Sequence, residues 1–231
     1  MSTEVEVAAG PAGRGAGHDG DPDRRAAAAM RAASHLLAGR DLTDAQLDEL
    51  ARRVEGWATA VDDAPVRDKR AYMVRRGGLA EFMVTGVPQP PPPEGSVLRF
   101  DELSCIGGPS SGMSMGFTYR RDGDETVAET VFGRAFEGPP ERVHGGAVAA
   151  AIDESMSLIL LLVGQPAYTV QLSIAFRAAA PVEQPVRFRS RLVRREGRKL
   201  FISCEGSSDE GVFAEAEGLF VLAPPLVAPP G

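Results

Sequence analysis

Two carboxylates interrupt an otherwise small and apolar stretch of the sequence, RVHGGAVAAAIDESMSLILLLVG, which runs from Arg142 to Gly164. Asp153 and Glu154 are adjacent in its middle. Because an isolated carboxylate is costly to bury, a helix of this composition needs a reason to carry one. A poorly solvated carboxylate is a better base or nucleophile than one in water, so Asp153 is a candidate catalytic residue. We interpret Glu154, one position further round the helix, as paired or solvent-reaching, with a share in catalysis as the alternative.

The residues before this helix are suited to binding an oxygen that carries negative charge. His144, Gly145 and Gly146 follow a Pro-Pro pair, where a loop is predicted to become the helix. The first N–H groups of a helix have no partner within it, and the helix dipole places partial positive charge there. Glycine allows a ligand to approach such groups closely, although a tight loop also favours glycine.

The spacing of the carboxylate and the glycines predicts how they could act together. Gly145 and Asp153 are eight residues apart, which is about 12 Å along an ideal helix. This separation is too large for both groups of one helix to act on a single carbonyl group. Two copies of the helix, packed antiparallel across a two-fold axis, would bring Gly145 of one copy near Asp153 of the other. The sequence therefore predicts a composite site at a dimer interface.

A period-two alternation of apolar and polar residues predicts six strands in the C-terminal part. Glycine-containing turns at Asp122-Gly123, Glu196-Gly197 and Asp209–Gly211 connect neighbouring strands. A helix over Ala147–Val163 separates the second strand from the third, and short connections predict that the last four strands form an antiparallel meander. The predicted strands are Met113–Tyr119, Thr126–Phe132, Tyr168–Phe176, Val186–Arg194, Lys199–Ser207 and Val212–Leu222.

The predicted sheet must bury its apolar face, and the predicted helix is the element available to cover it. The helix is apolar almost all round, and its alanines allow close approach on several sides. These features predict an α+β fold in which a curved antiparallel sheet wraps one long buried helix. A helix that is hydrophobic on every face also indicates that a second subunit covers what the first sheet cannot.

The N-terminal part of the chain has a different composition. Residues 1–23 are rich in Gly, Ala and Pro and are predicted to be a disordered tail. Residues 24–86 form a predicted helical extension, with one helix over residues 24–38 and a second that begins at Thr43, the N-cap of a capping box with Gln46. The second helix carries an apolar stripe, which predicts packing on its own domain, with an interaction helix as the alternative. Four consecutive prolines make residues 87–98 a predicted stiff linker to the main domain, residues 99–224.

Composition and charge argue against several classes of function. The formal net charge of -7 argues against nonspecific nucleic-acid binding, which needs a basic surface. Cys105 and Cys204 form neither a disulfide framework nor a zinc motif, so we expect two buried thiols. His144 is the only histidine of the strand-rich part, so we expect no metal and no cofactor. The longest aliphatic run, Leu158–Val163, has six residues against the roughly 20 of a membrane span, and no secretory signal is recognised. We therefore expect a soluble, cytoplasmic protein that does not bind membranes.

The segment GPPERVHGGAVAAAID resembles the motif of hot dog-fold acyl-CoA thioesterases. It is most similar to the PaaI-type group, including the mammalian thioesterase superfamily members that have Gly-Pro-Pro before His-Gly-Gly. The resemblance extends over about residues 107–222. It implies the hot dog fold, an antiparallel sheet around one helix that dimerises into a continuous sheet, in a homodimer or a dimer of dimers. It further implies hydrolysis of an acyl-CoA to a free acid and coenzyme A, in fatty acid metabolism.

The resemblance also assigns roles to individual residues. Asp153 matches the catalytic carboxylate, which either attacks the thioester carbonyl or activates a water molecule. Gly145 matches the glycine whose N–H forms the oxyanion hole, with Gly146 beside it, and His144 matches a histidine near the thioester. Thr169, sixteen residues after Asp153, matches a hydroxyl residue that helps to position the water or the carboxylate.

Three basic residues fall where relatives contact coenzyme A: Arg177, Arg198 and Lys199. Gly138 departs from the pattern, because many PaaI-type enzymes have an Asn at that position, six residues before the His. The absence of this Asn leaves in doubt what orients the substrate carbonyl or the water. Three further arginines alternate along one predicted strand, at positions 187, 189 and 191. We interpret them as a solvated outer face with carboxylate neighbours, with recruitment of the phosphates of coenzyme A as the alternative.

Two other functions are compatible with a hot dog domain. The first is a non-catalytic protein that binds acyl-CoA and regulates a partner, although such a sensor needs no carboxylate facing the thioester. The second is a hydratase or dehydratase, which needs an Asp followed closely by a His, and no histidine follows Asp153 in this sequence. Release of a free thiol from acyl-CoA substrates distinguishes hydrolysis from binding.

Overall fold

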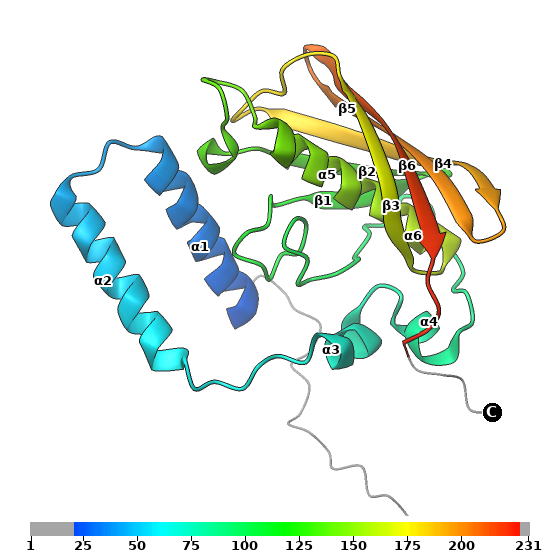
Figure 1. Ribbon diagram of the computed structural model, residues 1–231, viewed down its shortest axis with the longest axis horizontal. Coiled ribbons are helices and arrows are strands. Elements are labelled where there is room, and N and C mark those ends of the chain that lie inside the picture. The colour runs from blue at the N-terminus through cyan, green and yellow to red at the C-terminus, as the bar shows by residue number, and fades with distance from the viewer. Residues whose placement is uncertain (1–20, 227–231) are drawn as a thin grey trace, which may run out of the picture.

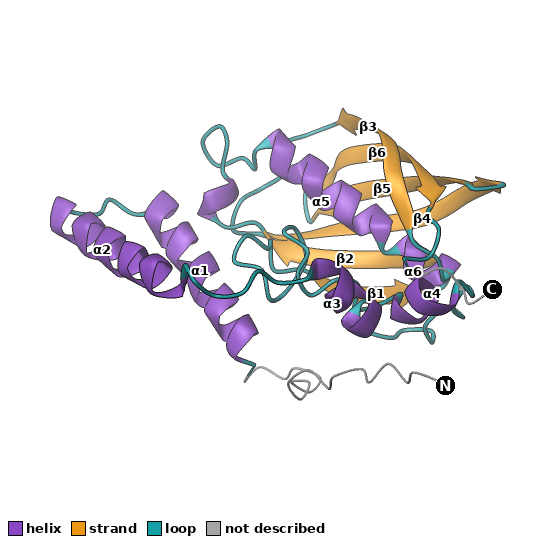
Figure 2. Ribbon diagram, turned by 60° about the horizontal axis from the view of Figure 1, so that its bottom comes forward, coloured by secondary structure: helices purple, strands orange, loops and turns teal. Residues whose placement is uncertain are grey.

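Six antiparallel strands form one curved sheet in the computed structural model, which describes residues 21–226. The order of the strands across the sheet is β1-β2-β4-β5-β6-β3. The long helix crosses one face of the sheet, which curves over it (Figures 1 and 2). The strands are β1 (Thr118–Asp122), β2 (Glu125–Val131), β3 (Ala167–Phe176), β4 (Pro185–Glu196), β5 (Lys199–Ser208) and β6 (Gly211–Leu222). This architecture confirms the predicted α+β fold.

The position of β3 differs from the prediction. β4, β5 and β6 form the predicted meander, but β3 pairs with β6 and not with β4. After β3, the N–H groups of Arg177 and Ala178 donate to the carbonyl of Phe213, and Glu183 N–H then donates to the carbonyl of Phe132 at the end of β2. The connection therefore crosses the end of the sheet, and β4 pairs with β2. A connection of this length can join strands that are not neighbours.

The first strand also begins later than predicted. The alternation from Met113 to Tyr119 predicts one strand, whereas β1 begins at Thr118. Gly116 has a φ of 73°, a left-handed conformation that interrupts extended backbone. In the preceding loop, Met115 donates its N–H to Ile106, and its carbonyl accepts a hydrogen bond from Thr130 Oγ1 at 2.5 Å.

The long apolar helix occupies the centre of the fold. It consists of α5 (Gly145–Ser157) and α6 (Ile159–Val163), which meet at Leu158. Ile152 and Met156 are fully buried, and the large aromatic side chains Phe188, Phe213 and Phe220 lie in the same core. By length and composition, Gly145–Val163 as a whole could cross a membrane, although its longest aliphatic run has only six residues. The core helix of a globular domain meets the same criterion.

Four helices precede the sheet: α1 (Pro22–Gly39), α2 (Asp44–Val61), α3 (Lys69–Arg76) and α4 (Ala80–Thr85). The capping box predicted at Thr43 and Gln46 is present at the start of α2. Residues 1–20 of the predicted tail lie outside the described residues. Asp21 is the N-cap of α1, and the last two residues of the predicted tail, Pro22 and Asp23, belong to that helix.

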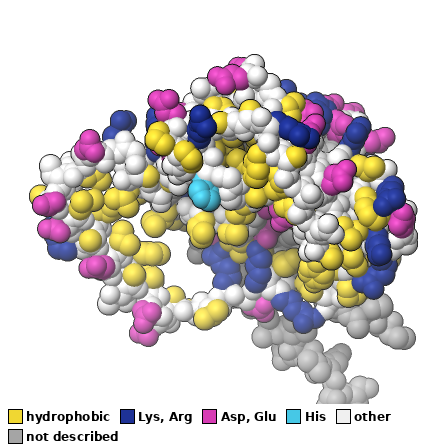
Figure 3. Space-filling view, turned by 45° about the horizontal axis from the view of Figure 1, so that its top comes forward, with side chains coloured by type: hydrophobic (Ala, Val, Ile, Leu, Met, Phe, Trp, Pro, Cys, Tyr) yellow, Lys and Arg dark blue, Asp and Glu magenta, His cyan; other side chains and the backbone are white. Residues whose placement is uncertain are grey.

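The apolar stripe of α2 does not pack on its own domain, so that prediction is wrong. No residue of α2 is buried in this chain, and Trp57 is 61% exposed. Figure 3 shows hydrophobic side chains gathered over the α1–α2 region, around an opening.

The two cysteines differ in burial. Cys105, which was expected to be buried, is exposed, whereas Cys204 is buried as expected.

The rest of the N-terminal extension contacts the sheet domain. Arg24 of α1 forms an ion pair with Glu102 at 2.7 Å, and Leu79 at the start of α4 belongs to the same core as the long helix. The proline-rich segment lies against the domain, because Gln89 N–H donates to the carbonyl of Gly164. Residues of the extension therefore contact the core around the long helix and the residue that ends it.

Candidate active site

Asp153 lies on the penultimate turn of α5 and is partly buried. Its Oδ1 accepts a hydrogen bond from Thr169 Oγ1 at 2.8 Å, which joins the helix to the start of β3. No donor within residues 21–226 contacts the other carboxylate oxygen, Oδ2. The structure therefore brings together the carboxylate and the hydroxyl that the sequence predicts to act together, and it leaves one oxygen of Asp153 available to a ligand.

The start of α5 presents one unpaired backbone donor. His144 is the N-cap, and its Nδ1 accepts a hydrogen bond from Gly146 N–H at 3.0 Å. Gly146 therefore offers no free donor in this structure, which differs from its predicted place beside Gly145 in the oxyanion hole. Gly145 is the first residue of the helix, and its N–H has no acceptor among the described residues. The imidazole of His144 accepts at Nδ1, so a neutral ring carries its proton on Nε2.

A cavity of about 430 Å³ opens beside Gly145, and Arg142, Phe176 and Arg177 are among the residues that line it. A Cβ at position 145 would lie 3.6 Å from Phe176 Cζ, an ordinary contact distance. Tight packing in a loop does not by itself explain the glycine at this position. Access of a ligand to the free N–H is consistent with it.

Gly145 and Asp153 do not meet within one chain. They lie about 12 Å apart along the helix, by the rise of an ideal helix. Gly145 is near Phe176 at the end of β3, whereas Asp153 contacts Thr169 at its start. One copy of the chain therefore supplies the donor and the carboxylate at two separate places, as the spacing predicts.

The strand beside Asp153 has a free edge. β3 pairs with β6 on one side only, and three large side chains on it are more than half exposed: Tyr168, Val170 and Phe176. The opposite edge of the sheet is partly covered, because Leu98 N–H and Arg121 N–H form hydrogen bonds between β1 and residues 96–98. The open edge is thus the one next to the candidate carboxylate.

Glu154 points away from this site and is paired, which confirms that interpretation of it. Its carboxylate accepts hydrogen bonds from Ser104 Oγ at 2.8 Å and from the Tyr119 hydroxyl at 3.3 Å. Burial raises the pKa of Glu154, against the two hydrogen bonds, which lower it. Burial and the nearby carboxylate of Glu154 also raise the pKa of Tyr119. Ser104 and Tyr119 were not predicted, because no local pattern connects them to Glu154.

The raised pKa of Glu154 predicts a pH-dependent stability. A carboxyl group with a higher pKa in the folded chain binds its proton more tightly there than in the unfolded chain. Its contribution to the free energy of unfolding is therefore complete below pH 4.5, the ordinary pKa, and is lost as the pH rises through the folded-state pKa. Glu154→Gln mimics the protonated acid and does not titrate. Above pH 4.5, we expect the unfolding free energy of the variant minus that of the wild type to increase by up to about 1.4 kcal/mol per pH unit, until the folded-state pKa is passed. Urea denaturation of both proteins across the pH range measures this difference, and parallel curves would contradict it.

The basic residues predicted to contact coenzyme A lie in two places. Arg177 is exposed, forms an ion pair with Glu215 at 2.8 Å and lines the cavity beside Gly145. Arg198 donates twice to the carbonyl of Leu222, and Lys199 next to it is exposed. Because Leu222 pairs with the first residue of β3, this pair lies at the opposite end of β3 from Arg177. One chain therefore cannot direct all three side chains to a single coenzyme.

The three alternating arginines of β4 have partners on the neighbouring strands. Arg187 pairs with Glu129, and Arg189 pairs with Asp122 and Glu125. Arg191 donates to Ser203 Oγ. The carboxylate neighbours of the first two confirm the interpretation of this strand as an outer face with compensated charge.

Comparison with known proteins identifies a family that part of the chain matches. Residues 141–214 match the family described as the Thioesterase superfamily. Human acyl-coenzyme A thioesterase THEM5 is 36% identical over 91 residues, which are 38% of this chain and 37% of the relative. Acyl-coenzyme A thioesterase THEM4 of Bos taurus is 34% identical over 117 residues, or 48% of each chain. The chain thus spans half or less of the length of these curated relatives.

A solved structure described as a thioesterase superfamily protein has the same fold. Its TM-score to this chain is 0.68 at 20% sequence identity, and the match covers 87% of this chain and 96% of the other. The match therefore includes much of the N-terminal extension as well as the sheet and the long helix. It confirms the hot dog fold that the sequence predicts.

Proposed function

We propose that the chain is an acyl-CoA thioesterase, which converts an acyl-CoA and water to a free acid and coenzyme A, because it has the hot dog fold and residues 141–214 match the Thioesterase superfamily. The observation that carries the proposal is the carboxylate of Asp153, which Thr169 holds beside an open strand edge with one oxygen free. The free N–H of Gly145 is the second element that the chemistry needs. The names of the curated relatives, acyl-coenzyme A thioesterases, support this activity. We also propose that the chain is related to the PaaI-type group, which its Gly-Pro-Pro and His-Gly-Gly motif supports.

The proposed reaction uses each of these groups once. Asp153 either takes a proton from a water molecule that attacks the thioester carbonyl or attacks that carbon itself to form an anhydride, which water then hydrolyses. Both routes pass through a tetrahedral intermediate with negative charge on oxygen. The N–H of Gly145 donates a hydrogen bond to that oxygen, a stabilisation of typically about 3 kcal/mol. The intermediate collapses, the carbon–sulfur bond breaks, and the sulfur leaves as a thiolate that takes up a proton.

The same proposal includes a homodimer. Two copies whose β3 edges pair antiparallel would form one continuous sheet and cover the exposed Tyr168, Val170 and Phe176. In that arrangement the α5 helices lie antiparallel, so Gly145 of each copy faces Asp153 of the other. Each dimer then has two composite sites.

An antiparallel edge also accounts for the two groups of basic residues. Arg177 lies at the end of β3 and Arg198 and Lys199 lie beside its start, so pairing two copies would bring Arg177 of one copy near Arg198 and Lys199 of the other. Coenzyme A carries several phosphates, which guanidinium and ammonium groups bind well. We propose that these three residues receive the coenzyme from both sides of the interface.

The proposal is tested by incubating the purified chain with a panel of aliphatic and aromatic acyl-CoA substrates. We expect catalytic release of a free thiol, followed with a thiol-reactive dye, from at least one of them. The alternative function, acyl-CoA binding without hydrolysis, predicts saturable binding in calorimetry with no thiol release. That second result would contradict the enzyme.

A further inference from the structure

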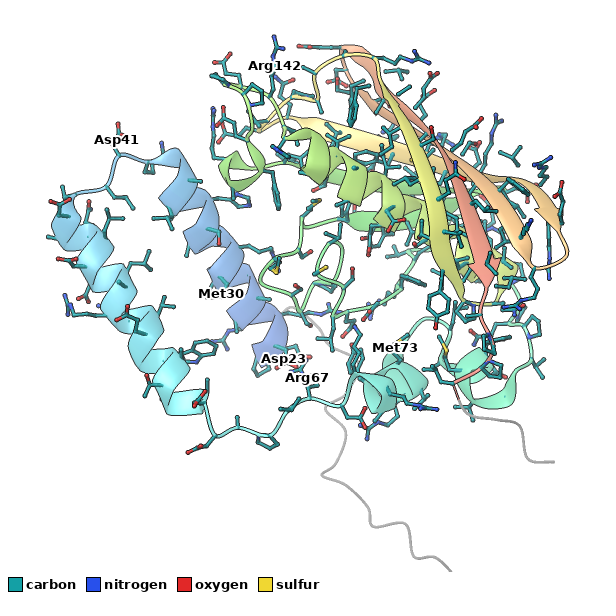
Figure 4. All side chains as sticks on the ribbon, viewed as in Figure 1. Asp23, Met30, Asp41, Arg67, Met73 and Arg142 are labelled. Carbon is teal, nitrogen blue, oxygen red and sulfur yellow. The ribbon has the colours of Figure 1, made fainter. Side chains whose placement is uncertain are left out.

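An apolar cavity lies between the N-terminal extension and the hot dog domain. Its volume is about 240 Å³. On one side it is lined by Met73 of α3, by Leu79, the N-cap of α4, and by Met83 of α4. On the other side it is lined by Leu160 of α6 and by Ala167, the first residue of β3. Figure 4 shows α3, the helix that carries Met73, below the ends of β3 and β6.

Two elements that carry the candidate site also line the cavity further along the chain. Leu160 follows Asp153 by seven residues, across the junction of α5 and α6 at Leu158, which is about 10 Å along the axis of an ideal helix. Ala167 precedes Thr169 by two residues on the same face of β3, at about 7 Å. The helix and the strand that hold the catalytic carboxylate therefore both lead from it to the cavity.

The chemistry of the lining selects an apolar ligand. Methionine, leucine and alanine make up half of the lining residues, and all but one of the others are glycine, proline or aromatic residues. Asp101 also lies in the lining, but its Oδ2 pairs with Lys69 Nζ at 2.6 Å and its Oδ1 accepts the N–H of Leu103. The charge of Asp101 is thus compensated, and the cavity offers no cation to a phosphate or a carboxylate. A flexible methionine wall adapts readily to an aliphatic chain.

We propose that this cavity receives the aliphatic part of the acyl group, and that α3 and α4 set the length of the chain that fits. The inference rests on the proposed thioesterase function and adds its substrate class, straight aliphatic acyl groups. The wall made by α3 and α4 lies outside residues 141–214, the part of the chain that matches the superfamily. Selectivity for chain length would then come from a part of the protein that takes no part in the chemical step.

Two substitutions of Met73 test the inference in opposite directions. Met73→Ala enlarges the cavity and Met73→Trp narrows it, while neither changes a group at Asp153. We expect kcat/KM measured from acetyl-CoA to palmitoyl-CoA to have its maximum at longer chains in the Ala variant and at shorter chains in the Trp variant. Each buried methylene group gained or lost changes kcat/KM by about fourfold.

The matched control is Met113→Ala, because Met113 is 72% exposed and does not line the cavity. Its chain-length profile is expected to equal that of the wild type. Circular dichroism confirms that all three variants fold. If the wild type hydrolyses acyl-CoA and both Met73 variants keep its profile, the inference is overturned and the proposed function stands. If no acyl-CoA is hydrolysed at all, the proposed function fails and the inference fails with it.

Discussion

Replacing Asp153 by Asn is expected to leave the fold intact and to lower kcat for acyl-CoA hydrolysis by about 10²–10⁴-fold. Asn has nearly the same shape as Asp, and its amide oxygen can still accept the hydrogen bond that Thr169 donates at 2.8 Å. It can neither take a proton from water nor attack a carbonyl carbon. The thiol-release assay measures the loss, and thermal unfolding followed by circular dichroism shows that the fold remains.

Glu154→Gln is the matched control for this variant. It makes the same change of charge at the adjacent residue, whose carboxylate contacts Ser104 and Tyr119 rather than Thr169. We expect it to retain most of the wild-type kcat. Wild-type turnover in Asp153→Asn would contradict the assignment of the catalytic carboxylate. An equal loss in both variants would show that the reaction depends on the charge of the helix and not on Asp153 alone.

Replacing Gly145 by Pro is expected to lower kcat by about 10²–10³-fold, because proline has no backbone N–H to donate to the oxyanion. Proline is well tolerated at the first position of a helix, which Gly145 occupies. His144 before it has φ -59° and ψ 132°, a conformation that suits the residue preceding a proline. The variant therefore removes the backbone N–H of residue 145 with little cost to the stability of the helix.

Gly145→Ala separates the loss of the donor from the addition of carbon atoms. Alanine keeps the N–H, and its Cβ would make only an ordinary contact, 3.6 Å from Phe176 Cζ. We expect kcat within a few-fold of the wild type, while the Pro variant loses the transition-state contribution of the donor. Equal activity of the Ala and Pro variants would show that this N–H does not stabilise the intermediate.

The helix-centred fold could be predicted from the sequence because period and composition report burial directly. The apolar segment around Ile152 and the alternating strands after it have this kind of pattern. The neighbour of β3 could not be predicted, since a connection length limits which strands can be joined but does not say which edge of the sheet a strand takes. The start of β1 was also missed, because one glycine at position 116 turns the chain where the alternation continues.

The candidate site was predictable to a similar extent. The spacing of Gly145 and Asp153 predicts that they lie apart on one helix, and the structure has this arrangement. The partner of Asp153, Thr169, came from the family resemblance, because a hydrogen bond across sixteen residues has no local signal. Ser104 is 50 residues from Glu154, so its contact depends on how the loop before β1 folds back over the helix. The exposed stripe of α2 shows the converse, since an amphipathic pattern predicts a buried face but not what buries it.

A heterodimer of two inactive chains tests most directly whether the site is shared between two copies. Chains carrying Asp153→Asn and Gly145→Pro, each with a different affinity tag, are coexpressed, and dimers with both tags are isolated. In a site that combines Gly145 of one copy with Asp153 of the other, each such dimer has one intact site, so we expect about half of the wild-type kcat per dimer. If the two groups instead acted within one chain, neither site would be intact. The mixed dimer would then be as inactive as its parents, and that result would contradict the account.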